Sequence, residues 1–197
     1  SRTTTMRTAG PLGPPSVTAL PASLPSVILS LMDRAVRAAA EARLPDAPAL
    51  AVGITQAAGL SADGEVALLD PVEAARRIDR GAVPLVCHGR AVARRLGRSR
   101  FACLDLLELF AFVRPARFCV PTPRGLADAL LLTPPSSLEG EAATLIAAAR
   151  ALLAELVASP GVDAEPVAQA MAEARWPWGL AVLSALGTSS PARGDPV

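Results

Sequence analysis

Apolar and polar positions follow two different periods along the chain, which is typical of a mixed α/β protein. Short apolar runs rich in β-forming residues occur at 49–55 (ALAVGIT), 65–69 (EVALL) and 83–87 (VPLVC), and a further short strand is expected at 101–103. The Ser-Ala-Asp-Gly sequence at 61–64 predicts a hairpin turn just before the second run.

Helical periodicity dominates the rest of the chain. An amphipathic helix is expected over 25–44, and Asp70, Pro71 and Glu73 form a capping-box arrangement that starts a helix over 73–80. Further helices are expected at 90–96, 104–112, 124–132, 138–158, 166–175 and 176–187, with 115–123 as a loop. This order predicts the α/β class, a small mixed sheet covered by helices, with helix 138–158 across the sheet and a helix-rich C-terminal third.

The ends of the chain differ in composition from its middle. Residues 1–24 are rich in proline and threonine and are expected to form a disordered leader. Residues 25–187 are expected to form a single α/β domain, because 51% of the chain is hydrophobic and can supply one core. Residues 188–197 are polar and are interpreted as a linker or tail.

Composition excludes several classes of protein. All 19 basic residues are arginine, so the chain has no lysine for a Schiff base or for a P-loop nucleotide site. The chain contains three cysteines, Cys87, Cys103 and Cys119, without a CxxC pair, which argues against a disulfide framework and a zinc ribbon. We interpret them as buried free thiols of a reducing compartment and expect a cytoplasmic protein.

The apolar stretches are too short for a membrane span. Arg114, Arg150, Glu155 and several prolines interrupt them, and no window reaches the roughly 18 to 20 uncharged residues that a span needs. The formal net charge is +1, so any nucleic-acid contact would need a local basic patch. We therefore expect no membrane partner.

Arginines gather between residues 90 and 100. Arg90, Arg94 and Arg98 are four residues apart, so a continuous helix would place them on one face, and Arg95 and Arg100 widen that surface. No acidic residue lies within 89–100, and arginine suits bidentate contact with phosphate. The segment is a candidate nucleic-acid interface, with a plain solvated helix face as the alternative.

Other candidate residues are isolated. His88, the one histidine, follows a predicted strand but has no neighbouring metal ligand or triad partner in sequence, so capping or packing is the alternative role. Asp105 and Glu108 are spaced to share a helix face, yet a Mg²⁺ site would need further carboxylates. Trp176 and Trp178 are candidates for stacking on bases, with packing against the last helices as the ordinary interpretation.

Two stretches carry a resemblance to a known family. Residues 84–96 (PLVCHGRAVARRL) and 105–127 (DLLELFAFVRPARFCVPTPRGLA) resemble the N-terminal region of bacterial DinG-like ATP-dependent DNA helicases, in the branch similar to a DnaQ-type 3′–5′ exonuclease. A weaker likeness continues to about residue 187, and residues 1–47 lie outside it. The resemblance implies a ribonuclease H-like, exonuclease-type fold. It also implies that the chain is a fragment or a split product of a helicase, because the motor with its nucleotide site and iron–sulfur cysteines is not in this sequence.

The exonuclease ligands implied by the resemblance are mostly missing. The first acidic motif would fall in residues 51–56, which contain no Asp or Glu. His88 matches the second motif, but Ala93 stands at its aspartate position. Asp105 matches an aspartate that is often structural, and no His or Asp follows in helix 138–158. Two Mg²⁺ ions could not be held without these ligands, so the resemblance implies a degenerate site with no catalytic residues, no metal and no cofactor.

The function expected from this reasoning is that of a non-catalytic accessory domain of a DinG-like DNA helicase, in DNA repair or replication. It would pack on the motor domain or assist binding of single-stranded DNA. The alternative is a stand-alone protein-interaction module that uses the helices of residues 138–187.

Overall fold

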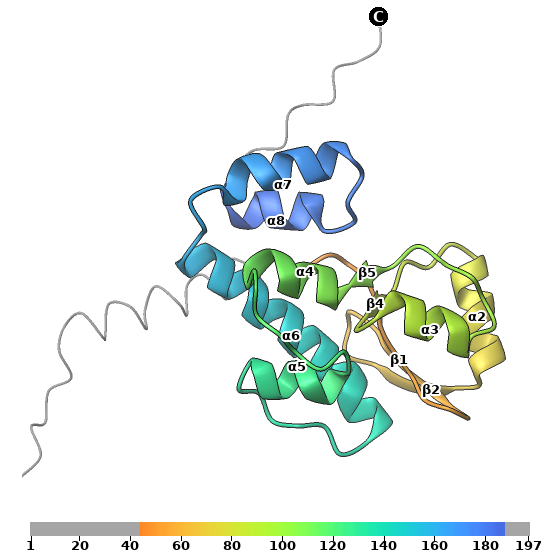
Figure 1. The fold of residues 1–197 in the computed structure, drawn as a ribbon. Coiled ribbons are helices and arrows are strands. Elements are labelled where there is room, and N and C mark those ends of the chain that lie inside the picture. The colour runs from red at the N-terminus through yellow and green to blue at the C-terminus, as the bar shows by residue number, and fades with distance from the viewer. Residues whose placement is uncertain (1–43, 188–197) are drawn as a thin grey trace, which may run out of the picture.

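The computed structural model describes residues 44–187, which form a five-stranded sheet and seven helices (Figure 1). The expected leader 1–24, nearly all of the expected helix 25–44 and the tail 188–197 lie outside the described residues. The strands are β1 (Ala49–Val52), β2 (Ala57–Leu60), β3 (Val66–Leu69), β4 (Leu85–Val86) and β5 (Leu104–Asp105). The helices are α2 (Pro71–Asp79), α3 (Gly89–Arg95), α4 (Leu106–Val113), α5 (Pro123–Ala129), α6 (Leu138–Ala158), α7 (Ala164–Glu173) and α8 (Gly179–Ala185).

The strands are ordered β3-β2-β1-β4-β5, and the sheet is mixed. Strand β2 runs antiparallel to both β1 and β3, whereas β1, β4 and β5 are parallel to one another. The α/β class and the small mixed sheet are therefore confirmed. The expected hairpin turn at 61–64 joins β2 to β3, with Gly64 in the left-handed region at φ 85°.

The prediction of one strand over 49–55 is wrong. Strand β1 ends at Val52, and the chain turns back through a hydrogen bond of 2.8 Å from the Gly53 amide to the Gln56 carbonyl. Strand β2 follows at once with the sequence AAGL. Alanine and glycine have weak strand propensity, so β2 gives little signal in the sequence, and pairing on both edges overrides that preference.

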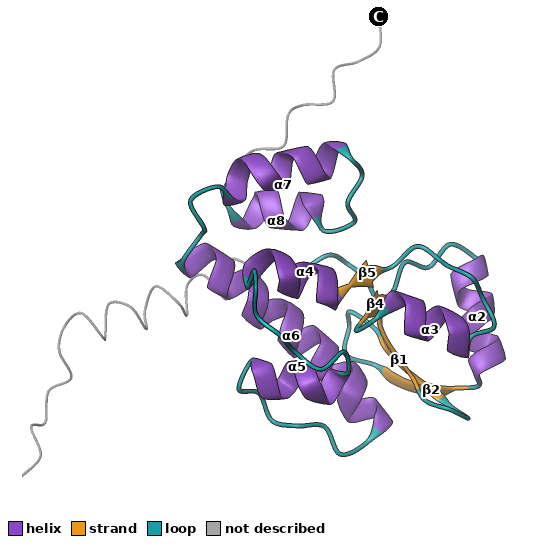
Figure 2. Ribbon diagram, viewed as in Figure 1, coloured by secondary structure: helices purple, strands orange, loops and turns teal. Residues whose placement is uncertain are grey.

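The sheet has helices on both faces, and residues of β1 alternate between them. Ala49 and Ala51 belong to a core formed with α4, α5, α6 and α8, whereas Leu50 and Val52 belong to a smaller core formed with α2 and α3. This alternation follows from the two-residue period of a strand. Figure 2 shows the strands between these two groups of helices. The molecule thus has three layers, with the sheet in the middle.

Helix α6 crosses the larger face of the sheet, as predicted. It contacts β1 and β2 along much of its length, and eight of its residues are buried. Small side chains such as Ala142, Ala148 and Ala149 are fully buried on this helix, which allows its backbone to approach the sheet closely. Helices α7 and α8 pack together and join this core through Trp178, Val182 and Leu183. No helix within residues 44–187 is long and apolar enough to cross a bilayer.

The strand expected at 101–103 begins at residue 104 instead. Strand β5 consists of Leu104 and Asp105, paired in parallel with Leu85 and Val86. Asp105 therefore ends a strand and, in the same position, caps the helix α4 that follows.

Candidate nucleic-acid interface

Helix α3 carries the predicted basic surface and lies on the smaller helical face of the sheet. Val92 and Ala93 are buried toward the protein, so the opposite side of the helix presents Arg90 and Arg94 to solvent. Arg90, Arg94 and Arg100 are exposed and form no ion pair with any other residue of 44–187. These three side chains are available for contact with a polyanion.

Arg98 does not belong to the same helix face, contrary to its spacing in the sequence. Helix α3 ends at Arg95, and Gly97 adopts a left-handed conformation with φ 68° that turns the chain. The Arg98 guanidinium pairs with Asp79 of α2 and lies 3.4 Å from the Ala75 carbonyl oxygen, and its side chain is only 30% exposed. The acidic partner missing from residues 89–100 is supplied by the neighbouring helix, which gives Arg98 a structural role.

Arg95 is exposed but is held at the end of the sheet. Its Nη1 atom donates a hydrogen bond to the carbonyl oxygen of Val52, the last residue of β1. The guanidinium also interacts favourably with the Glu141 carboxylate of α6. Arg95 therefore joins three elements, α3, β1 and α6, beside a small depression in the surface.

This depression has a volume of about 60 Å³ and lies at the carboxyl ends of the parallel strands β1 and β4. The carboxyl edge of parallel strands is where open α/β folds commonly bind ligands. The walls include His88, Ala91, Arg95, Thr122 and Glu141. Burial raises the pKa of the Glu141 carboxyl, and Arg95 partly offsets that effect.

The residues present do not form a metal centre at this position. Glu141 is the one carboxylate that lines the depression, and residues 51–56 provide none. No group of three or more His, Cys, Asp or Glu side chains suited to a metal ion occurs within the described ranges. A two-metal site for phosphodiester hydrolysis needs several convergent carboxylates, so this donor set does not fit one.

Of the positions matched to the exonuclease motifs, His88 and Asp105 lie near each other, whereas Ala93 supplies no ligand atom. His88 precedes α3 without a side-chain capping bond and lines the depression. Ala93 is 1% exposed, so it faces the protein interior. Asp105 accepts hydrogen bonds from the amides of Leu107 (3.0 Å) and Gly89 (2.7 Å). Its carboxylate is thus occupied in linking the starts of α4 and α3.

The two tryptophans are packed and hydrogen-bonded within the fold. Trp178 is fully buried, and its Nε1 donates to the Asp105 carbonyl oxygen at 2.8 Å. Trp176 is half-buried, stacks at an angle against Phe112 with ring centroids 5.2 Å apart, and donates from Nε1 to Glu108 at 3.0 Å. Glu108 is therefore engaged with Trp176 and does not form a carboxylate pair with Asp105.

A larger apolar groove lies at the opposite end of α6, between α4 and α7. It encloses about 780 Å³, and its walls include Phe112, Leu156, Val167, Met171 and Trp176. This groove could not be predicted from the sequence, because its walls come from three helices and the segment between α6 and α7.

Comparison with known proteins identifies no relative: no protein-family model, curated protein or solved structure matches the chain.

Proposed function

We propose that this chain is a non-catalytic accessory domain that binds single-stranded DNA for a DinG-like DNA helicase, with a ribonuclease H-like, exonuclease-type fold and a degenerate active site. The strand order β3-β2-β1-β4-β5, with β1 and β4 parallel and β2 antiparallel, supports the part of this proposal that concerns the fold. The mismatch between the donor set at the β1 end and a two-metal centre supports the loss of chemistry. The motor domain would be the second partner.

The observation that carries the proposal is the placement of Arg90 and Arg94. Both side chains are exposed and lack an ion-pair partner within residues 44–187. They also lie on a short helix whose first amide, that of Gly89, is held by Asp105. Because the helix backbone is fixed, phosphates can bind to these charges without a further cost of ordering the backbone.

The test is fluorescence anisotropy of a labelled oligo-dT across a salt series, with wild type and Arg90→Gln/Arg94→Gln. Each phosphate contact on a single strand contributes about 0.7 to the slope of log affinity against log salt, so loss of two contacts should flatten the slope by about 1.4. Arg150→Gln/Arg175→Gln removes the same charge from exposed positions outside α3 and should keep the full slope. Equal slopes for wild type and the α3 variant would contradict the proposal.

The same proposal predicts no nuclease activity. Purified chain with Mg²⁺ or Mn²⁺ should leave a labelled single strand at full length, because Glu141 is the one carboxylate beside the β1 end. Shortening of the strand that persists in Glu141→Gln would indicate a contaminating nuclease. Shortening that Glu141→Gln abolishes would show that the site is catalytic and would overturn this part of the proposal.

The apolar groove between α4 and α7 favours a second candidate function, a protein-interaction module. Phe112, Val167 and Met171 line a groove of about 780 Å³, a size that accommodates side chains of a partner. On this alternative the chain would show no salt-dependent binding of DNA at all, and Arg90 and Arg94 would be solvated surface residues.

A further inference from the structure

The loop between α4 and α5, residues 114–122, exposes an aromatic ring. All six aromatic residues of the chain lie in its described part, and Phe118 is the exposed one, with 84% of its surface accessible. The other five are buried or half-buried in the fold. An exposed apolar residue alone is ordinary, so its meaning depends on how the loop holds it and on what surrounds it.

Both ends of this loop are fastened to the helices. At the start, Arg114 donates to both carboxylate oxygens of Glu155 on α6, at 2.7 to 2.9 Å, and to the Ala129 carbonyl oxygen at 2.6 Å. At the end, Val120 packs so closely on Gly125 of α5 that a Cβ at Gly125 would lie 2.3 Å from the Val120 carbonyl oxygen. The loop is therefore braced on two helices, and the Phe118 ring is presented from a fixed backbone.

Unpaired positive charge lies on either side of the ring in sequence. Arg117 and Arg124 are exposed, and neither forms an ion pair with another residue in the described portion of the chain. Arg114 differs from them because Glu155 neutralises it. Arg117 and Phe118 line the same surface depression, and Arg124 follows in the first turn of α5. An exposed ring with arginines around it is an arrangement by which proteins bind single strands, with bases stacked on the ring and phosphates held by arginine.

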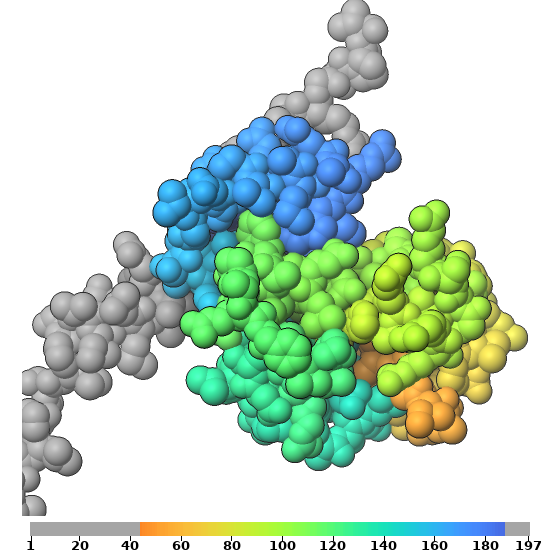
Figure 3. Space-filling view, in the orientation of Figure 1, coloured from red at the N-terminus to blue at the C-terminus, as the bar shows by residue number. Residues whose placement is uncertain are grey.

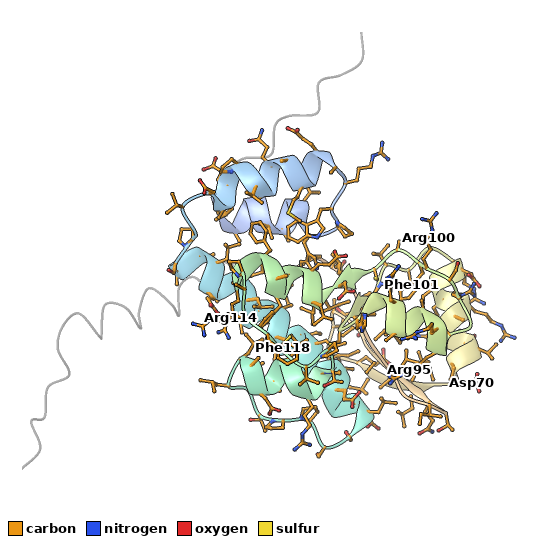
Figure 4. All side chains as sticks on the ribbon, viewed as in Figure 1. Asp70, Arg95, Arg100, Phe101, Arg114 and Phe118 are labelled. Atoms are coloured by element: carbon orange, nitrogen blue, oxygen red, sulfur yellow. The ribbon has the colours of Figure 1, made fainter. Side chains whose placement is uncertain are left out.

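The loop also adjoins the α3 surface. Pro121 and Thr122 line the depression at the β1 end together with Ala91 and Arg95 of α3. The space-filling view shows the green surface of the loop and the yellow-green surface of α3 on one face of the molecule (Figure 3). Figure 4 labels Phe118 on this loop and Arg95 on α3. A strand held by α3 can therefore continue onto the loop without crossing to another face.

We infer that Phe118 is a stacking platform for a base of the single-stranded DNA, with Arg117 and Arg124 holding the adjacent phosphates. This inference rests on the proposed function, since it names a second contact of the same bound strand. It distinguishes two kinds of contact within one interface, because α3 contacts only phosphates whereas the loop also contacts a base.

The test compares oligo-dT with an abasic oligonucleotide of the same length, which has the same phosphates but no bases. Stacking of one base on an exposed ring should make Phe118→Ala bind oligo-dT about five- to tenfold more weakly than wild type. Its affinity for the abasic strand and its salt slope should be unchanged. Phe118→Trp should retain affinity, and its added indole fluorescence should be quenched by oligo-dT but not by the abasic strand.

Two controls separate this inference from the proposed function. Val162→Ala, which trims an exposed apolar side chain between α6 and α7, should bind both strands like wild type. If Phe118→Ala binds oligo-dT as tightly as wild type while Arg90→Gln/Arg94→Gln weakens binding, the platform is refuted and the proposed function stands. Equal loss of affinity for both strands would also refute stacking. Absence of binding by wild type to either strand would overturn both proposals.

Discussion

The Asp105 link between α3 and α4 makes a quantitative prediction about stability. The carboxylate accepts the Leu107 amide as the N-cap of α4, and it accepts the Gly89 amide at the start of α3. Loss of an N-cap costs about 1 kcal/mol, within a range of about 0.5–2. A part-buried amide left without an acceptor costs about 1–3 kcal/mol more. Asp105→Ala should therefore lower the free energy of unfolding by about 2–4 kcal/mol.

The chain offers a matched control in Asp70, which is labelled in Figure 4. Asp70 is also an aspartate N-cap that accepts the amide two residues ahead, from Val72 at 2.7 Å, but it is exposed and its carboxylate forms no second bond within the described residues. Asp70→Ala should lower the free energy of unfolding only by the contribution of its N-cap hydrogen bond, about 1 kcal/mol. The loss of stability in Asp105→Asn should lie between those of Asp70→Ala and Asp105→Ala, because the asparagine amide oxygen can accept one of the two N–H groups.

The assay is equilibrium unfolding in urea followed by tryptophan fluorescence. Trp178 is a suitable reporter because it is fully buried and hydrogen-bonded to the Asp105 backbone carbonyl, which the substitution leaves in place. The difference between the Asp105→Ala and Asp70→Ala midpoints, multiplied by a common m-value, gives the contribution of the Gly89 bond. If the two variants lose the same stability, water satisfies the Gly89 amide and Asp105 is an ordinary cap.

Three further changes test the packing, the buried thiol and the role of Arg98. Gly179→Ala should lower the free energy of unfolding by about 1–3 kcal/mol, because its Cβ would lie 2.6 Å from the Cβ of Ala172. Gly140→Ala is the control: its Cβ would meet no atom closer than 3.4 Å, so calorimetry should show unchanged or higher stability. Burial raises the pKa of the Cys87 thiol from 9.0 to about 12, so the folded state retains its proton longer than the unfolded state does. The contribution of Cys87 to stability should therefore fall above pH 9 by at most about 1.4 kcal/mol per pH unit. Burial raises the pKa of Cys103 to about 12 as well, so Cys87→Ala should reduce the slope in urea titrations with reductant present without abolishing it. Arg98→Ala should lower the melting temperature slightly and leave the salt slope for oligo-dT unchanged, since its charge is already paired.

Elements with a strong local signal were predictable from the sequence. Asp70 and Pro71 start α2 as expected, because an aspartate N-cap and a proline in the first turn act through their own backbone neighbours. The long apolar helix 138–158 was predicted with the bounds of α6. Its position across the sheet was expected from the apolar runs together with the family resemblance. Ser61–Gly64 likewise formed the expected turn.

Features that depend on distant partners were not predictable. The strand AAGL forms because β1 and β3 pair with both of its edges, and neither pairing is visible in its own composition. Arg98 was grouped with Arg90 and Arg94 by its spacing, although the helix was expected to end at residue 96, and spacing cannot show that Asp79 approaches from α2. The exposure of Phe118 had no sequence signal, since its loop is rich in apolar residues that a core could have taken.

The electrostatics of the depression at the β1 end restrict where a strand can bind. Arg95 is satisfied by the Val52 carbonyl and lies near the Glu141 carboxylate, so the depression carries little net positive charge. A phosphate placed inside it would meet the Glu141 charge at close range and would lose affinity. Exposed arginines that form no ion pair within residues 44–187 include Arg90 and Arg94 on the outer side of α3 and Arg117 on the loop after α4. A bound strand should therefore pass over the rim, with its phosphates on α3 and a base on Phe118, and leave the depression empty. Glu141→Gln removes the repulsive charge, so it should tighten binding of oligo-dT if the strand passes this close, and an unchanged affinity would place the path elsewhere.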